Sequence, residues 1–194
     1  LHFATPWPQT RDGDWFIDVR DEGKNYDENA RGYHSTSELR YHTDGTNMVA
    51  LLCLQKAREG GESSIVSSAS IYNRMLEKRP DLLDVMYEGY PHDRRGAQPN
   101  GEPRLAPWKL PVFSFVNGRF ICVYDRMPSE WGRDMAGKPF TKIDHAAFDF
   151  ADALTQDENF RLDMAFQPGD IQFLNNFTIF KTECSNFTFN FIFK

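Results

Sequence analysis

The sequence predicts a mainly β fold with helical insertions (α+β), arranged as a sandwich or jelly roll in a single domain over residues 1–194. Three observations lead to this class. Short runs rich in β-branched and aromatic residues alternate with tight turns. Helical spacing is confined to two insertions, near residues 71–87 and 144–154. Strands and helices therefore do not alternate one by one, which argues against a parallel sheet of βαβ units.

The expected helices are marked by their apolar spacing or by a start signal. Ala147, Ala151 and Leu154 would share one face of an amphipathic helix. Pro80 predicts the start of a short helix, because a proline at a first helical turn loses no hydrogen bond. The expected helices span residues 71–78, 81–87 and 144–154.

The other expected elements are strands separated by turns. Asn117-Gly118 lies between two β-rich runs and predicts a hairpin, because both central positions of its tight turn need positive φ. Pro168-Gly169 suits a type II turn between two further strands. The expected strands span residues 48–57, 64–67, 110–116, 119–124, 159–166, 171–174 and 177–180.

Composition limits the partners and the compartment. The chain has 22 basic and 28 acidic residues and a net charge of −6, which disfavours binding to nucleic acid. The longest apolar run, residues 48–54, is far shorter than the about 20 residues that cross a bilayer. Three widely spaced cysteines without a CxxC pair suit a reducing compartment. We therefore expect a cytoplasmic protein with a small-molecule partner and no membrane contact; the oligomeric state cannot be predicted.

His42 and Asp44 are the candidate metal ligands. They stand two residues apart, directly before the apolar run at 48–57, and on an extended segment they project from the same side. A neutral imidazole nitrogen and a carboxylate oxygen make up two thirds of a 2-His-1-carboxylate triad, which leaves positions open on Fe(II). The same tripeptide also fits an ordinary loop in which Asp44 precedes Gly45.

The wider segment resembles the TauD/TfdA family of Fe(II)/2-oxoglutarate-dependent dioxygenases. The resemblance implies that His42 and Asp44 bind Fe(II) and that the Ser63 hydroxyl contacts the cosubstrate 2-oxoglutarate. It implies a double-stranded β-helix (jelly roll) with the iron at one mouth. It also implies oxidation of 2-oxoglutarate to succinate and CO₂, coupled to hydroxylation of a small organic acid-type substrate. The motifs that carry it are His42-Thr43-Asp44-Gly45, Gly60-Gly61-Glu62-Ser63 and the run FQPGDIQFLNN at 166–176.

The resemblance breaks down near the C-terminal end. The family pattern places its third ligand, a histidine, where this sequence has Lys181, and a protonated lysine cannot coordinate iron. The family's later arginine, which pairs with 2-oxoglutarate, has no counterpart because no arginine follows Arg161. We therefore expect the activity of this chain to be impaired.

Three alternatives stay open. The first is a catalytically inactive jelly-roll binding protein in which Lys181 pairs with Asp44. The second is a mis-spliced or truncated form of the enzyme, incomplete at both ends, whose phenylalanine-rich tail after Ile179 is foreign. The third is an unrelated all-β module.

Overall fold

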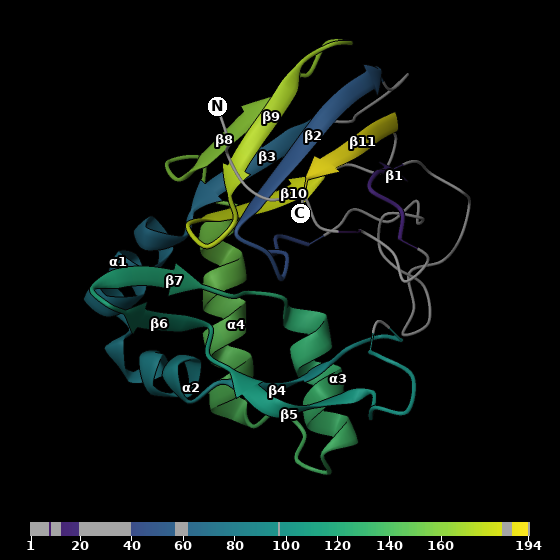
Figure 1. Cartoon of the computed structure of the whole chain (residues 1–194). Helices are drawn as coiled ribbons and strands as arrows, with labels where there is room; N and C mark the ends of the chain where they lie inside the picture. Colours follow the sequence, from purple (N-terminus) through teal and green to yellow (C-terminus); the bar gives the residue numbers. More distant parts are fainter. Residues whose placement is uncertain are drawn as a thin grey trace.

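The computed structural model describes residues 8, 13–19, 40–56, 62–96, 98–183 and 188–193. It shows a mixed fold with mostly strands and few helices (Figure 1). The strands are β1 (Ile17–Val19), β2 (Met48–Gln55), β3 (Ser63–Ser67), β4 (Tyr90–Asp93), β5 (Leu105–Leu110), β6 (Phe113–Val116), β7 (Arg119–Cys122), β8 (Arg161–Met164), β9 (Ile171–Asn175), β10 (Ile179–Glu183) and β11 (Thr188–Phe193). The helices are α1 (Ser68–Lys78), the 3₁₀ turn η2 (Pro80–Leu82), α2 (Leu83–Glu88), α3 (Arg126–Met135) and α4 (Lys142–Thr155).

Two antiparallel sheets share one apolar interior. The first has the order β1-β11-β2-β9 and the second has the order β10-β3-β8. Alternate residues of a strand point to opposite faces, so each sheet turns one set of side chains toward the other. Leu51 of β2 and Leu174 of β9 are buried against half-buried Ile65 of β3 and Ile179 of β10. This cluster connects the two sheets.

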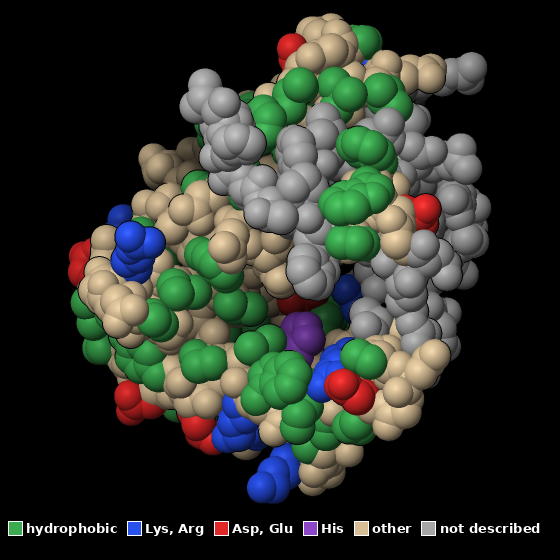
Figure 2. All heavy atoms as spheres, in the orientation of Figure 1, with side chains coloured by type: hydrophobic (Ala, Val, Ile, Leu, Met, Phe, Trp, Pro, Cys, Tyr) green, Lys and Arg blue, Asp and Glu red, His purple; other side chains and the backbone are tan. Residues whose placement is uncertain are grey.

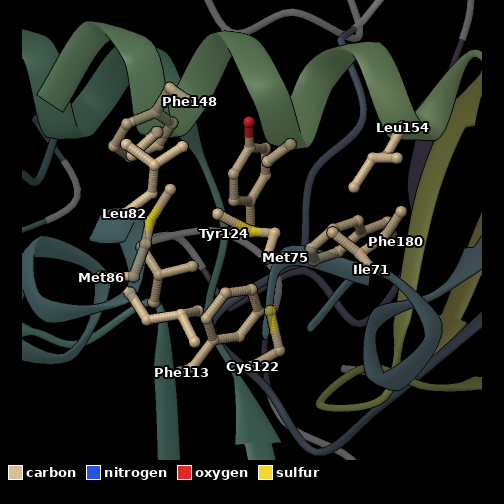
Figure 3. Packing of buried hydrophobic residues seen from close by; sticks show 14 of the residues in the cluster. Ile71, Met75, Leu82, Met86, Phe113, Cys122, Tyr124, Phe148, Leu154 and Phe180 are labelled. Carbon is tan, nitrogen blue, oxygen red and sulfur yellow. The ribbon is translucent and has the colours of Figure 1, made fainter. Parts of the chain in front are cut away.

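The opposite face of the β10-β3-β8 sheet packs against the helices. Val66 and Phe180 are directly paired across β3 and β10, and both are buried in the larger core cluster. Figure 3 shows Phe180 beside Ile71 of α1 and below Leu154 of α4. Lys181, the next residue along β10, therefore points away from the helices.

The sequence signals predict the local elements well. Asn117 and Gly118 adopt φ values of 51° and 73° and join β6 to β7, as the hairpin signal predicts. The predicted helices at 71–78 and 144–154 lie within α1 and α4, and the helix at 81–87 is divided between η2 and α2. The strands predicted at 64–67, 119–124 and 171–174 correspond to β3, β7 and β9 within two residues at each end. The strand predicted at 48–57 corresponds to β2, which ends at Gln55; residue 57 lies outside the described residues.

Four expectations were wrong in part. The strand predicted at 110–116 begins only at Phe113, because residues 105–110 pair with β4 instead. The strand predicted at 159–166 is limited to Arg161–Met164. The strand predicted at 177–180 begins at Ile179, because Thr178 N–H donates to the Asn175 carbonyl in a turn. Helices are not confined to two insertions, since α3 forms a third helical region.

Helix α4 begins with a capping box. Thr141 accepts a hydrogen bond from the Asp144 N–H, and the Asp144 carboxylate accepts one from the Thr141 N–H at 2.8 Å. The buried carboxylate also accepts from the Tyr90 hydroxyl at 3.0 Å. Burial by itself would raise the pKa of Asp144, but these hydrogen bonds and the nearby Arg133 charge outweigh it and lower the pKa.

We expect Asp144→Asn to reduce the free energy of unfolding at pH 7 by about 1–3 kcal/mol. A carboxyl whose pKa is lower in the folded state stabilises the protein above its unfolded pKa of about 3.9, and that contribution is lost as the pH falls through the folded pKa. Urea denaturation between pH 7 and pH 3 should therefore show that the free energies of unfolding of Asp144→Asn and of the unaltered protein become similar in acid. Asp134→Asn, at an exposed position of α3, is the control and should change little. A difference that is constant with pH would contradict the role of this charge.

Candidate metal centre

His42, Asp44 and Lys181 meet at one point. The Lys181 Nζ lies 2.7 Å from His42 Nε2 and 3.0 Å from Asp44 Oδ2. The main chain aligns the first pair: His42 N–H donates to the Lys181 carbonyl at 2.9 Å, and Lys181 N–H donates to the His42 carbonyl at 3.1 Å. Strand β10 thus places residue 181 beside a segment 139 residues earlier in the chain.

The loop that carries Asp44 is held from two sides. The buried Asn176 side chain donates to the carbonyls of Asp44 and Thr46, and its Oδ1 accepts from the Asp44 N–H at 3.0 Å. Thr43 N–H donates to the Tyr124 carbonyl at 2.7 Å, and Thr43 Oγ1 accepts from the Tyr124 N–H at 2.8 Å. The position of Asp44 is therefore determined by the β9–β10 turn and by the segment after β7.

The electrostatics favour a neutral His42. Burial, followed by the positive charge of Lys181, lowers the pKa of His42 to about 4, although Asp44 acts in the opposite direction. His42 Nδ1 lies 2.9 Å from the Arg40 carbonyl, which can only accept, so Nδ1 carries the ring proton. Nε2 then carries the free lone pair of the ring, and this lone pair accepts a hydrogen bond from Lys181.

A second acid–base pair lies near these three residues and was not identified from the sequence. Arg95 Nη2 lies 3.9 Å from Asp125 Oδ2. Burial, together with the negative charge of Asp44, raises the pKa of Asp125 to about 7, against the opposing charges of Arg95 and Lys181. No local motif marks Asp125, which lies between β7 and α3 and directly precedes α3. Figure 2 shows a recess on one face of the molecule, with a histidine side chain at its edge and acidic and basic atoms inside it; the view labels no residues.

The other basic residues near Arg95 in the sequence do not form a shared anion site. Arg104 makes a two-pronged ion pair with the buried Asp93, at 2.7 and 2.6 Å. Arg94 pairs with Glu102, and Lys109 pairs with Glu88. Each positive charge is thus balanced by an acidic neighbour.

Ser63 lies on the same side of its sheet as Lys181. Lys181 pairs with Ile65 across β10 and β3, and Ser63 is two residues before Ile65, so their side chains share a face. The Ser63 side chain is buried, and its hydroxyl has no hydrogen-bond partner among the residues that the structure describes. This placement is compatible with the predicted contact to 2-oxoglutarate, which stays a prediction.

The side chains of His42 and Asp44 could hold a metal ion, on the condition that the Lys181 ammonium moves away. His42 Nε2 and Asp44 Oδ2 approach the same positively charged group, so the ammonium of Lys181 stands where a cation shared by the two donors would lie. Within the described part of the chain, no group of three His, Cys, Asp or Glu side chains converges to hold a metal. A divalent ion would therefore have two protein donors and would require the ammonium to move.

The sequence matches one family model and two curated relatives. The model of the "Taurine catabolism dioxygenase TauD, TfdA family" matches residues 5–180. FR-33289 synthase of Streptomyces rubellomurinus is 33% identical over 180 residues, which cover 91% of this chain and 52% of that protein. The taurine hydroxylase-like protein SAT17 of Stachybotrys chartarum is 31% identical over 170 residues, which cover 86% of this chain and 42% of that protein. The chain thus spans about half the length of these relatives or less.

Solved structures show the fold. Asparagine oxygenase, in complex with Fe(II), 3-hydroxyasparagine and succinate, aligns with a TM-score of 0.69 at 14% identity, covering 98% of this chain and 60% of that one. The non-heme iron oxygenase OrfP, in complex with Fe and α-ketoglutaric acid, aligns with a TM-score of 0.62 at 14% identity, with the same coverage.

In the described ranges, no helix combines the length and the apolar character needed to cross a membrane.

Proposed function

Because the chain belongs to the TauD/TfdA family of dioxygenases, we propose that it carries the core of an Fe(II)- and 2-oxoglutarate-dependent dioxygenase that hydroxylates a small organic acid-type substrate. The observation that carries this proposal is the approach of His42 Nε2 and Asp44 Oδ2 to one cationic group. On this proposal, the two facing sheets are the walls of a jelly roll, with the site at one end of their shared interior.

The side chains have separate tasks in this proposal. His42 and Asp44 would hold Fe(II), which together with 2-oxoglutarate and dioxygen supplies the oxidising chemistry of the family. The Arg40 carbonyl keeps the proton on His42 Nδ1, so that Nε2 faces the metal position. Asn176 holds the main chain on both sides of the Asp44 side chain. The Ser63 hydroxyl would donate to a carboxylate of 2-oxoglutarate.

The flanking charges suit a small polar substrate. Arg95 can bind a carboxylate and Asp125 can accept from an amine or a hydroxyl, and both act electrostatically on the residues at the centre. Similar solved structures of asparagine oxygenase and of OrfP hold hydroxylated amino acids. This supports a small substrate with an acidic group.

The test uses Lys181→His, which restores an imidazole at the third ligand position. We expect this variant to form succinate from 2-oxoglutarate with Fe(II) and ascorbate. Adding His42→Ala should lower the rate of succinate formation at least about 100-fold. Even the loss of a residue that only hydrogen-bonds to a metal ligand lowers metal affinity or activity about 10–100-fold. Equal succinate formation with and without His42 would contradict the assignment of this residue.

One observation favours the binding-protein alternative. Lys181 is completely buried and its ammonium contacts both candidate ligands, so the unaltered site is already electrically balanced. Anaerobic reconstitution followed by elemental analysis separates the two functions. One iron per chain in the unaltered protein would rule out a permanently metal-free site.

A further inference from the structure

We propose that the ammonium of Lys181 and a divalent metal ion are alternative occupants of one site, so that this lysine blocks the metal site from within. The inference rests on the proposed function, because it assumes that His42 and Asp44 are the metal ligands. It adds a property of this chain's own residue: an internal cation that competes with the metal.

The lone pair of the His42 ring leaves room for one occupant only. A neutral imidazole with its proton on Nδ1 has a single lone pair, on Nε2. This lone pair accepts a hydrogen bond from the Lys181 ammonium, with Nζ 2.7 Å from Nε2. A metal can bind Nε2 only after that hydrogen bond is broken, so the two occupants exclude each other at His42. Asp44 has two oxygens and imposes no such choice by itself.

The positive charge of Lys181 also opposes a bound metal. The ammonium lies 3.0 Å from the carboxylate oxygen that would bind the metal. A divalent ion at bonding distance from that oxygen would be within a few ångströms of a like charge that is itself completely buried, so water screens the repulsion less than it would in bulk solution. The metal must therefore displace the side chain as well as compete for the lone pair.

Lys181 has no easy route out of the site. Its side chain is completely buried, and its main chain is fixed by the paired hydrogen bonds to His42 and by the register with Ile65. Moving the ammonium away from Asp44 would leave a buried charge without its ion pair, which is costly. The closed arrangement is therefore the stable one in the absence of metal.

The experiment measures Co(II) binding by calorimetry and visible absorption, without any turnover. Lys181→Met removes the charge at similar length, and we expect it to raise Co(II) affinity at least about tenfold, or about 1.4 kcal/mol. Lys181→His should raise it more, because it adds a third donor. Lys138→Met is the matched control, since it makes the same chemical change at an exposed position of the chain. It should leave Co(II) affinity as in the unaltered protein.

The outcomes distinguish the inference from the proposed function. If the unaltered protein binds one Co(II) as tightly as Lys181→Met, through His42, the inference is overturned and the proposed function stands. If none of these proteins binds Co(II), the metal site at His42 and Asp44 is wrong, and the inference falls with it. A further measurement does not depend on Lys181→Met. At the Co(II) concentration that half-saturates Lys181→His, the Tm of the unaltered protein should stay unchanged, and a rise equal to that of Lys181→His that is lost in His42→Ala would overturn the inference.

Discussion

Asn176→Ala is expected to lower the free energy of unfolding by about 2–4 kcal/mol, because it removes several buried hydrogen bonds at once. The side chain is buried and links the end of β9 to the main chain at Asp44 and Thr46, with the Thr46 contact at 2.9 Å. The alanine variant would leave two carbonyls and one N–H without these partners. Urea denaturation followed by circular dichroism measures the change.

The neighbouring Asn175→Ala is the matched control. The Asn175 side chain is exposed and accepts a single hydrogen bond, at 3.2 Å, from the Phe177 N–H. Its loss should cost less than about 1 kcal/mol. In a Lys181→His background, Asn176→Ala should also weaken Co(II) binding, because Asp44 is no longer held in place, whereas Asn175→Ala should not. Equal effects of the two asparagines would show that the loop is held by other contacts.

Gly132→Ala is expected to destabilise the protein by about 3 kcal/mol or more, through overpacking. A Cβ at this position would lie 2.0 Å from the Pro91 carbonyl oxygen of β4, and a backbone atom cannot move aside as a flexible side chain can. In an exposed helix, the same substitution would stabilise by about 1 kcal/mol, so the contact with β4 reverses the sign. Thermal and urea denaturation both report this difference.

The matched control is Gly45→Ala, because an added Cβ there meets no atom within 4 Å and φ is not positive. Its effect should lie within about 0.5 kcal/mol. Gly132→Ala should also disturb the site, since α3 begins directly after Asp125. Stability equal to that of the unaltered protein would mean that α3 does not pack against β4 this closely.

Local signals in the sequence predicted those elements whose cause is local. The Asn117-Gly118 turn follows from the φ values that these two residues tolerate, and α4 follows from the spacing of Ala147, Ala151 and Leu154. Helix α3 was missed because its ten residues include Pro128 and Gly132, which both oppose helix formation. Gly132 is explained only by the nearby β4 backbone, which the local sequence does not show.

For the site, the spacing of His42 and Asp44 and a family resemblance were enough to nominate two ligands and to place Lys181 at the third position. Whether Lys181 reaches them depends on the pairing of β10 with β3 and on the bridge to His42, contacts that join residues more than a hundred positions apart. The same holds for Asn176 and Asp125, whose roles arise from packing between distant segments. Turn and helix preferences act within a few residues, so they can be read along the chain. The contact between an ammonium, an imidazole and a carboxylate exists only after the sheets have brought them together.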